Sequence, residues 1–400
     1  MLDPTATNNP AELQRMQPVA RAIAYYLPQF HPNPDNDRWW GPGFTEWTNV
    51  TKAKSLFRGH HQPNLPADLG FYDLRVPETR QQQAELAARY GIEGFCYWHY
   101  WFGNGRRILE RPFQEVLDSR QPNFPFCLAW ANESWLGIHH GIEAKRILIA
   151  QEYPGINDYE RHFASIEAAF HDDRYIKVVG KPLFVVYRPH QLPDAREFVN
   201  CWRKLAERSG LKGLHLAGVA EPGWHAADHG FDAEIPHEPW RSIHRIPKPF
   251  LDRTLRRIFG LDVAQLRVDW LSKPRTHRYE DMVKFASFDN SSEQMTYPCV
   301  VPNWDTTPRQ HKHSIVLRDS EPRHFERLMQ KAVDSLHDRD PDNRIIFIKS
   351  WNEWAEGNYL EPDQRYGHQY LEIVKRLIIS GSSTVATESD RLSECSQSLA

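Results

Sequence analysis

The chain has 400 residues, 40% of them hydrophobic, which is enough to bury one large core, and a barrel with long loops reaches this length as a single domain. Its 49 Lys and Arg nearly balance 52 Asp and Glu, and the net charge of −3 excludes a global field that would attract nucleic acid or an anionic membrane. The 14 Trp, 15 Tyr and 20 Phe are unusually numerous, so each is expected either to fill the core or to stack on a flat ligand such as a sugar ring.

The two ends of the chain carry no signal of a folded element. Residues 1–17 are an N-terminal extension without the basic stretch and apolar run of a secretory signal, so we expect a cytoplasmic protein. No segment approaches the ~18 consecutive apolar residues of a membrane-spanning helix. Residues 18–380 are expected to form one domain, and the Ser-rich, aperiodic residues 381–400 a disordered tail.

Eight short runs rich in β-branched and aromatic residues recur along the chain, each followed by a stretch with helical periodicity. This alternation is typical of the α/β class with a parallel sheet, and most of the runs are apolar enough to be covered on both faces. We therefore predict a single (β/α)8 TIM barrel with right-handed connections. The predicted strands are Ala22–Leu27, Glu93–Trp98, Phe126–Trp130, Leu183–Tyr187, Leu214–Val219, Asp232–Pro236, Tyr297–Val301 and Arg344–Lys349.

The segments between the strands carry helix boundaries and two long loops. Pro77 opens one predicted helix and Gly91 closes it, while Asp194 caps another. Residues 28–76 after the first strand and 237–278 after the sixth are too long for simple connections, and long ordered loops are usually functional. The second loop has a basic run that favours either a phosphate or acidic-sugar contact or a solvated helix face. The basic residues are Arg241, Arg245, Lys248, Arg253, Arg256 and Arg257.

Polar and aromatic residues gather where the predicted strands end. In a barrel of this kind, catalytic and binding side chains come from the carboxyl ends of the strands. A sugar ring needs apolar surfaces for its C–H faces and charged or amide groups for its hydroxyls. We therefore predict a carbohydrate site. Its expected binding residues are His31, Trp98, His99, Tyr100, Trp130, Asn132, Glu133, Tyr187, Arg188, Glu221, Trp304, Asp305, Asn352 and Trp354.

Two glutamates directly follow the last predicted strand. Glycosidic cleavage typically uses two carboxyl groups, which lie ~5–5.5 Å apart in retaining enzymes. If the strand turns into a helical start, Glu353 and Glu356 share one face with Cβ atoms ~5–6 Å apart. We predict that these two are the catalytic pair. Glu133 is the alternative acid, because it also follows a strand directly.

Metal chemistry is not indicated. The five cysteines are odd in number and widely scattered, which favours neither a disulfide framework nor a metal site. The paired histidines at 60–61 and 139–140 lack the helical spacing or the cysteine partners of a zinc site. We expect no metal and no cofactor.

Several blocks of the sequence resemble the WbsX-like proteins, a branch of the glycoside hydrolase family 99-like domains. The similarity runs from about Ala22 to Leu377. It implies a (β/α)8 barrel related to retaining endo-α-mannosidases. The blocks that carry it are AIAYYLPQFHPNPDNDRWWGPGFTEWTNVTKAKSLFRGHHQPNLPADLGFYDLR, GIEGFCYWHYWF, FCLAWANESW, GKPLFVVYRP, VVPNWDTTPR and SWNEWAEGNYLEPD.

The resemblance also implies a mechanism and roles for the two glutamates. The wider family is understood to use neighbouring-group participation, in which a carboxylate deprotonates the 2-hydroxyl of the sugar, and this oxygen attacks C1 to give a 1,2-anhydro sugar. A second carboxyl protonates the leaving oxygen and later activates water. On the block WNEWAE, the resemblance makes Glu353 the base and Glu356 the acid and subsequent base.

The expected function is therefore retaining hydrolysis of an internal, mannoside-like α-linkage in a bacterial polysaccharide or oligosaccharide. A glycosyltransferase or transglycosylase in O-antigen, lipopolysaccharide or other polysaccharide biosynthesis is the alternative, because the WbsX-like branch is commonly described so. No glycine-rich phosphate loop supports a nucleotide-sugar donor. A non-catalytic carbohydrate-binding protein is the third hypothesis. The only expected partner is the saccharide, and the sequence leaves the oligomeric state open.

Overall fold

A computed structural model of the chain describes residues 18–137, 146–247, 273–288 and 294–379, with the isolated positions 257, 268 and 270. The expected extension over residues 1–17 and the expected tail over residues 381–400 lie outside the described residues. So do Lys248, Arg253 and Arg256 of the basic run. In the described part of the chain, no helix combines the length and the apolar character needed to cross a membrane.

Eight parallel strands form the central sheet, and each overlaps one predicted run, so the predicted barrel is confirmed. Nearly all of their residues are buried, as strands covered on both faces require. The strands are β1 (Arg21–Tyr26), β2 (Ile92–His99), β3 (Phe126–Trp130), β7 (Lys181–Val186), β8 (His215–Ala220), β9 (Ala233–Pro236), β11 (Cys299–Val300) and β13 (Ile345–Ile348).

The sheet closes into a barrel through a single short contact. The hydrogen-bonded order runs β11, β13, β1, β2, β3, β7, β8, β9. Glu234 of β9 then bridges in parallel to Thr296, just before β11. The amide of Glu234 donates to the carbonyl of Met295, and the amide of Tyr297 donates to the carbonyl of Glu234, both over 2.8 Å. All eight strand ends therefore point to one mouth of the barrel.

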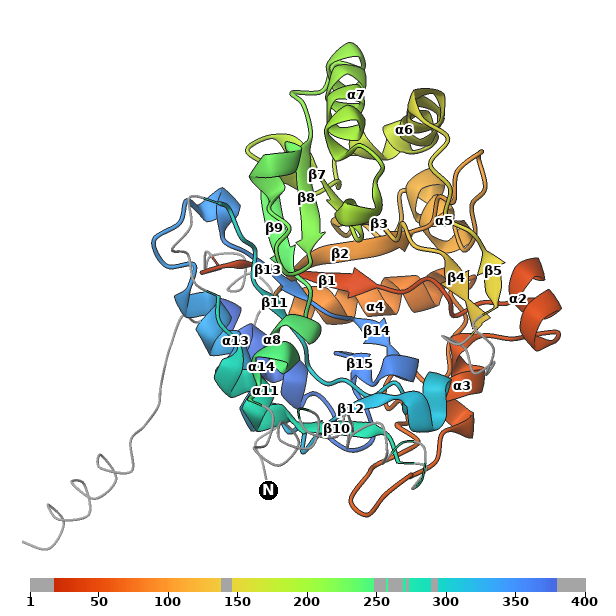
Figure 1. Cartoon of the computed structure of the whole chain (residues 1–400), viewed down its shortest axis with the longest axis vertical. Helices are drawn as coiled ribbons and strands as arrows, with labels where there is room; N and C mark the ends of the chain where they lie inside the picture. Colours follow the sequence, from red (N-terminus) through yellow and green to blue (C-terminus); the bar gives the residue numbers. More distant parts are fainter. Residues whose placement is uncertain are drawn as a thin grey trace, which may run out of the picture.

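Helices cover the outside of the barrel. The longer ones are α4 (Pro77–Arg89), α5 (Arg111–Ser119), α6 (Ile156–Phe170), α7 (Ala195–Arg208), α11 (Tyr279–Phe285), α13 (Pro322–Asp334) and α14 (Gln369–Ile379). Pro77 begins α4, and Gly91 follows its end with a φ of 80°, where glycine is favoured. The side chain of Asp194 caps α7 by accepting a hydrogen bond from the amide of Glu197. Figure 1 shows α6 and α7 on one side of the barrel and α11, α13 and α14 on another.

The loops at the mouth carry short elements that were not predicted, because such short runs hold too little periodicity. β4 pairs with β5 and β14 with β15 in antiparallel fashion, whereas β10 and β12 run parallel. These elements are α2 (Pro34–Trp40), α3 (Glu46–Lys52), β4 (Trp135–Leu136), β5 (Ile147–Ile149), α8 (Trp240–Arg245), β10 (Arg275–Arg278), α12 (Thr307–Gln310), β12 (Ile315–Arg318), β14 (Asn352–Glu353) and β15 (Asn358–Tyr359). A further short strand, β6 (Lys177–Val178), pairs with the amino end of β7 in antiparallel fashion. Single 3₁₀ turns span Pro189–Gln191, Ala226–His229, His311–His313, Pro341–Asn343 and Trp354–Glu356.

Both predicted long loops contain structure. The loop after β1 holds α2 and α3, and α3 packs against the 3₁₀ turn Trp354–Glu356 that follows β13. The loop after β9 holds α8, where Arg241 is half-buried and Arg245 is exposed. Arg257 is also exposed. The described part of the basic run thus has the exposure of a solvated face.

Candidate active site

A cleft with a volume of ≈ 360 Å³ lies at the mouth of the barrel. Segments that follow several of the barrel strands form its walls, which is where barrels of this kind place their active sites. The structure brings both predicted glutamates together with aromatic and charged residues from separate strand ends. The predicted residues that line the cleft are Trp98, Tyr100, Glu133, Tyr187, Arg188, Trp304, Glu353 and Glu356.

The two glutamates stand on one tight turn. Glu353 ends β14, and the chain then forms the 3₁₀ turn Trp354–Glu356. Side chains three residues apart eclipse one another in such a turn, so both carboxyls face the cleft. Gly357 ends the turn with a φ of 62°, and a Cβ there would lie only 2.9 Å from the Cβ of Asp305. Only glycine fits at this position, which fixes the end of the turn that carries both glutamates.

Glu353 lies in a buried environment that changes its acidity. The pKa of Glu353 is raised to about 7, first by burial and then by the negative charge of Glu356. The positive charges of Lys349 and Arg309 oppose this rise. The hydroxyl of Ser350 also opposes it, by donating a hydrogen bond of 2.6 Å to Oε2 of Glu353. A carboxyl with a pKa near neutrality can exchange protons with a substrate at physiological pH.

Glu356 is held by an arginine that the sequence analysis did not select. Nη1 of Arg309 donates to Oε1 of Glu356 over 2.6 Å. The same guanidinium binds Oε2 of Glu46, with Nη2 at 3.1 Å and Nε at 3.2 Å. Glu46 lies on α3 and is fully buried, at 0% exposure. This chain of contacts fixes one oxygen of Glu356 and leaves Oε2 without a hydrogen bond from a described residue.

Lys349 provides a second positive charge beside the glutamates. It follows β13, is 6% exposed and lines the cleft. Its Nζ lies 4.8 Å from the ring centroid of Trp304 and 5.6 Å from that of Tyr187. Aromatic faces attract a cation at such distances. The ammonium makes no hydrogen bond to a described residue, so its donors are available to a bound molecule.

Arg188 connects several polar residues at another part of the cleft wall. Its Nε donates to Glu133 over 3.0 Å and its Nη1 to Glu221 over 2.6 Å. Asn132 holds the backbone of Arg188 on both sides, accepting from its amide at 2.7 Å and donating to its carbonyl at 2.9 Å. Glu221 also lies 2.8 Å from Nδ1 of His237. Glu133 is thus engaged in an ion pair.

Aromatic rings from different strands line the cleft. Trp98 stacks on Tyr25 with ring centroids 4.7 Å apart and meets the ring of Tyr187 edge-on at 5.1 Å. Tyr100 meets Trp135 edge-on at 5.5 Å, so packing against neighbouring rings fixes the orientation of each wall. Such a surface offers apolar faces to the C–H side of a sugar ring.

Three predicted binding residues lie in the core instead of the cleft lining. The ring of His31 bonds to a backbone carbonyl and is 2% exposed. His99 shares a 2.8 Å hydrogen bond with His162, and burial lowers the pKa of His99 to about 3. Trp130 is 1% exposed and donates to the carbonyl of Trp101. Successive side chains of a strand point to opposite faces, and His99 and Trp130, at the ends of β2 and β3, both contact His162 of α6. His31 lies in the loop after β1.

Three further predicted residues support the turn from behind. Asn352 pairs with the backbone of Leu27, accepting at 2.7 Å and donating at 3.0 Å, and so ties the turn to the end of β1. Trp354 donates to Glu361 over 2.6 Å. Asp305 is 3% exposed and lies on the far side of the cleft wall. None of the three lines the cleft.

The sequence analysis missed several residues of the lining. Lys349 was hidden at the end of a predicted strand, and Arg309 stood in the block VVPNWDTTPR without a separate signal. In the described part of the chain, no three His, Cys, Asp or Glu side chains are grouped to hold a metal ion. The lining residues that were not predicted are Leu27, Gln29, Ala131, Trp135, Trp240, Thr306, Arg309, Gln310, His313, Ile315 and Lys349.

Comparison with known sequences gives one family and two relatives. The sequence model of the family described as glycosyltransferase WbsX matches residues 22–374. The uncharacterized protein WxcX from two strains of Xanthomonas campestris pv. campestris is 36% identical over 380 residues. This alignment covers 94% of the chain but only 52% of each relative, so the chain spans about half the length of the curated relatives it matches.

Comparison with solved structures gives the fold. A glycoside hydrolase-like protein superposes with a TM-score of 0.56 at 13% identity, over 89% of this chain and 93% of that one. Two structures of the GH99 endo-α-mannosidase from Bacteroides thetaiotaomicron each superpose with a TM-score of 0.52 at 15% identity. They cover 89% of this chain and 95% or 96% of theirs. At these low sequence identities, the similarity to the solved structures shows a shared barrel fold and nothing beyond it.

Proposed function

This chain belongs to the family described as glycosyltransferase WbsX, and from the arrangement of its cleft we propose that it is a retaining glycosidase that cleaves an internal, mannoside-like α-linkage. The observation that carries the proposal is the pair Glu353 and Glu356 on one turn of an aromatic cleft. Two carboxyls in different environments, one buried with a raised pKa and one bound by an arginine, are what an acid and base pair requires.

The roles are those that the resemblance to the family 99-like domains implies. Glu353 is the base on the 2-hydroxyl, and with a pKa of about 7 its carboxylate binds a proton more strongly than an exposed one. The 2-oxygen attacks C1, the bond from C1 to the glycosidic oxygen breaks, and Glu356 gives its proton to the leaving oxygen. Arg309 fixes Oε1 of Glu356, so Oε2 is the oxygen available for this step. Water then attacks C1 with Glu356 as base, the bond between C1 and the 2-oxygen breaks, and Glu353 returns its proton to the 2-oxygen.

The aromatic walls and the charged groups supply binding. Trp98, Tyr100 and Trp304 offer ring faces and edges to the sugar, and Lys349 offers three donors to its hydroxyls. Arg188 keeps Glu133 engaged in an ion pair, which supports a binding role for Glu133 in place of the alternative catalytic one.

Product analysis tests the proposed reaction. The protein is incubated with defined α-mannans and with bacterial polysaccharides, and the molecular masses of the products are measured by mass spectrometry. Shortened fragments, each carrying one added water, are the expected result. Intact polymers throughout the panel would contradict glycosidase activity.

Sugar transfer is the second candidate, favoured by the description of the family as a glycosyltransferase. The same cleft would then accept a sugar hydroxyl in place of water. In the same experiment, products longer than the starting saccharide would identify transfer. A polymer that is bound but neither cut nor extended would identify a binding protein.

The charge of Lys349 is expected to set the pH dependence of the reaction. Its ammonium lowers the pKa of Glu353, which must be ionised to act as the base. Lys349→Met removes that charge, so the pKa of Glu353 rises and the increase of kcat/KM with pH moves to higher pH. Lys349→Arg keeps the charge and serves as the control, whose profile stays near that of the wild type. An unmoved profile in the Met variant would show that Glu353 is not the titrating base.

A further inference from the structure

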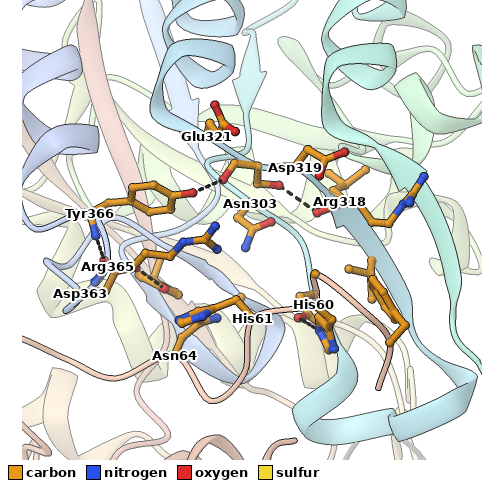
Figure 2. Close-up of a pocket in the computed structure, with 18 of the residues that line it drawn as sticks. His60, His61, Asn64, Asn303, Arg318, Asp319, Glu321, Asp363, Arg365 and Tyr366 are labelled. Carbon is orange, nitrogen blue, oxygen red and sulfur yellow. Dashed lines mark hydrogen bonds and ion pairs between the residues drawn. The ribbon is translucent and has the colours of Figure 1, made fainter. Parts of the chain in front are cut away.

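A second pocket, with a volume of ≈ 140 Å³, lies outside the catalytic cleft (Figure 2). It is formed by the loop after β1, by β12 with the turn that follows it, and by the segment after β15. No residue lines both this pocket and the cleft. The proposed reaction does not use this pocket.

Two hydrogen-bonded segments, the one before α12 and the one that carries Glu356, form a wall between the pocket and the cleft. The amide of Asp305 donates to the carbonyl of Glu356 over 2.6 Å, which joins the segment before α12 to the catalytic turn. Trp304 and Thr306 line the cleft, whereas Asp305 between them lines the pocket. On the catalytic turn, Glu356 lines the cleft and the next residue lines the pocket. A molecule in the pocket therefore lies against the back of the wall that carries Glu356.

Two carboxylates of this pocket are satisfied by internal donors. Asp305 accepts from His60 at 2.8 Å and from Gln62 at 2.7 Å through Oδ2, and from a backbone amide through Oδ1. Asp363 accepts from the hydroxyl of Tyr359 at 2.7 Å and from two backbone amides. Both side chains are therefore part of the framework of the pocket and have little capacity to bind a cation.

The arginines of the pocket have no such partners. The guanidinium of Arg365 lies 4.7 Å from the ring centroid of Tyr366, and Figure 2 shows its side chain reaching toward the middle of the pocket. Arg365, Arg318 and Arg58 make no ion pair with a described residue. The side-chain amide of Asn64 makes no hydrogen bond with a described residue either.

Two further acidic residues line the pocket. Glu321 pairs with Arg323 at 2.7 Å, so its charge is compensated. Asp319 is exposed, has a φ of 58° and makes no ion pair with a described residue. Asp305 and Asp363 keep their negative charges, but internal donors occupy their acceptor atoms. The free donors of three guanidinium groups therefore outnumber the free acceptors of the pocket, which favours an acceptor-rich ligand such as a carboxylate.

We propose that this pocket binds a sugar residue that carries a carboxylate, such as a uronic acid. Arginine recognises carboxylates through paired, parallel hydrogen bonds, and Asn64 and Asn303 offer amide groups to the hydroxyls of the ring. That the ligand is a saccharide follows from the proposed function, on which this part of the inference rests. That the ligand carries a carboxylate is inferred from the arginines of the pocket alone. An acidic residue of the substrate polymer would then be held behind the catalytic wall while another part of the polymer lies in the cleft.

Binding of small probes tests the proposal without any measurement of catalysis. Titration calorimetry or ligand-observed NMR compares D-glucuronate, D-glucose and inorganic sulfate on the full chain. D-glucuronate is expected to bind at least ~10-fold more tightly than D-glucose, because hydrogen bonds between charged groups are the stronger ones. Arg365→Ala is expected to weaken the binding of D-glucuronate by a similar factor. Arg208→Ala removes an exposed arginine of α7 outside the pocket and should change nothing.

Each other outcome has a defined meaning. If D-glucose binds as tightly as D-glucuronate, the pocket does not recognise a carboxylate, and the proposal is wrong. If sulfate binds as tightly as D-glucuronate, the pocket is an anion site that does not recognise a sugar. No binding of D-glucuronate would overturn it outright. If Arg365→Ala melts at a lower temperature than the wild type, Arg318→Gln, on the other side of the pocket, repeats the test. A protein that cleaves no polysaccharide but binds D-glucuronate here would refute the proposed function and retain this site.

Discussion

Glu353→Gln and Glu356→Gln are each expected to lower turnover by at least ~100-fold, which is the scale of a positioned acid or base. Glutamine keeps the shape of the side chain but neither accepts nor gives up the proton that the reaction moves. Removing the charge of Glu353 from a buried site should cost little stability, because that carboxyl is poorly solvated in the folded protein. Steady-state kinetics and a thermal melt of each variant measure both effects.

Leaving-group dependence separates the two roles. The aryloxide group of an aryl glycoside can leave without being protonated. The rate of the first step in Glu356→Gln should therefore recover on such a substrate, whereas the rate in Glu353→Gln should stay low. Glu372→Gln, which changes an exposed glutamate of α14, is the matched control and should retain wild-type turnover. Wild-type turnover in either active-site variant would remove the two-glutamate mechanism.

A substrate without its 2-hydroxyl is expected to bind but to show no detectable cleavage. In the proposed reaction this hydroxyl is the nucleophile, and no third carboxyl is available on the turn Trp354–Glu356 to replace it. The loss should therefore fall on kcat, while binding of the 2-deoxy substrate, measured by calorimetry, changes far less. The matched comparison is the 3-deoxy analogue, which lacks a hydroxyl of similar polarity and retains the nucleophile.

Cleavage of the 2-deoxy substrate at a rate near that of the parent would show that a protein side chain attacks C1 or that water attacks directly. Glu133 would then be the next carboxyl to test, because it lines the same cleft as the two glutamates. Its ion pair with Arg188 would have to open for such a role.

The barrel could be predicted because its strands are buried on both faces and therefore read as apolar runs. Phe126–Trp130 matches its prediction residue for residue, and the other seven differ only at their ends. Helix boundaries were readable where one residue has a specific local role, as Asp194 does in capping α7. The short elements at the mouth were not readable, because their conformation depends on contacts with other loops.

The candidate site was predictable for residues whose function requires their position at a strand end. Glu353 and Glu356 lie in the segment that follows β13, and their spacing places both at one turn. Trp130 was misplaced because sequence alone does not show which side of the strand end faces the cleft. Arg309 and Glu46 were missed because their pairing joins segments 263 residues apart.

The pocket behind the catalytic wall illustrates the same limit. Arg365, Arg318 and Arg58 come from three distant segments, and each alone is an ordinary charged residue. Their common property is the absence of an ion-pair partner among the described residues, which only the structure shows.

Proton NMR of the first product formed is the most direct measurement of the central claim. The proposed reaction inverts C1 twice, once when the 2-oxygen attacks and once when water opens the anhydro sugar, so the new reducing end should first appear as the α-anomer. Spectra recorded in the first minutes, before mutarotation, report this configuration. A product that first appears as the β-anomer would contradict neighbouring-group participation and indicate a single displacement by water.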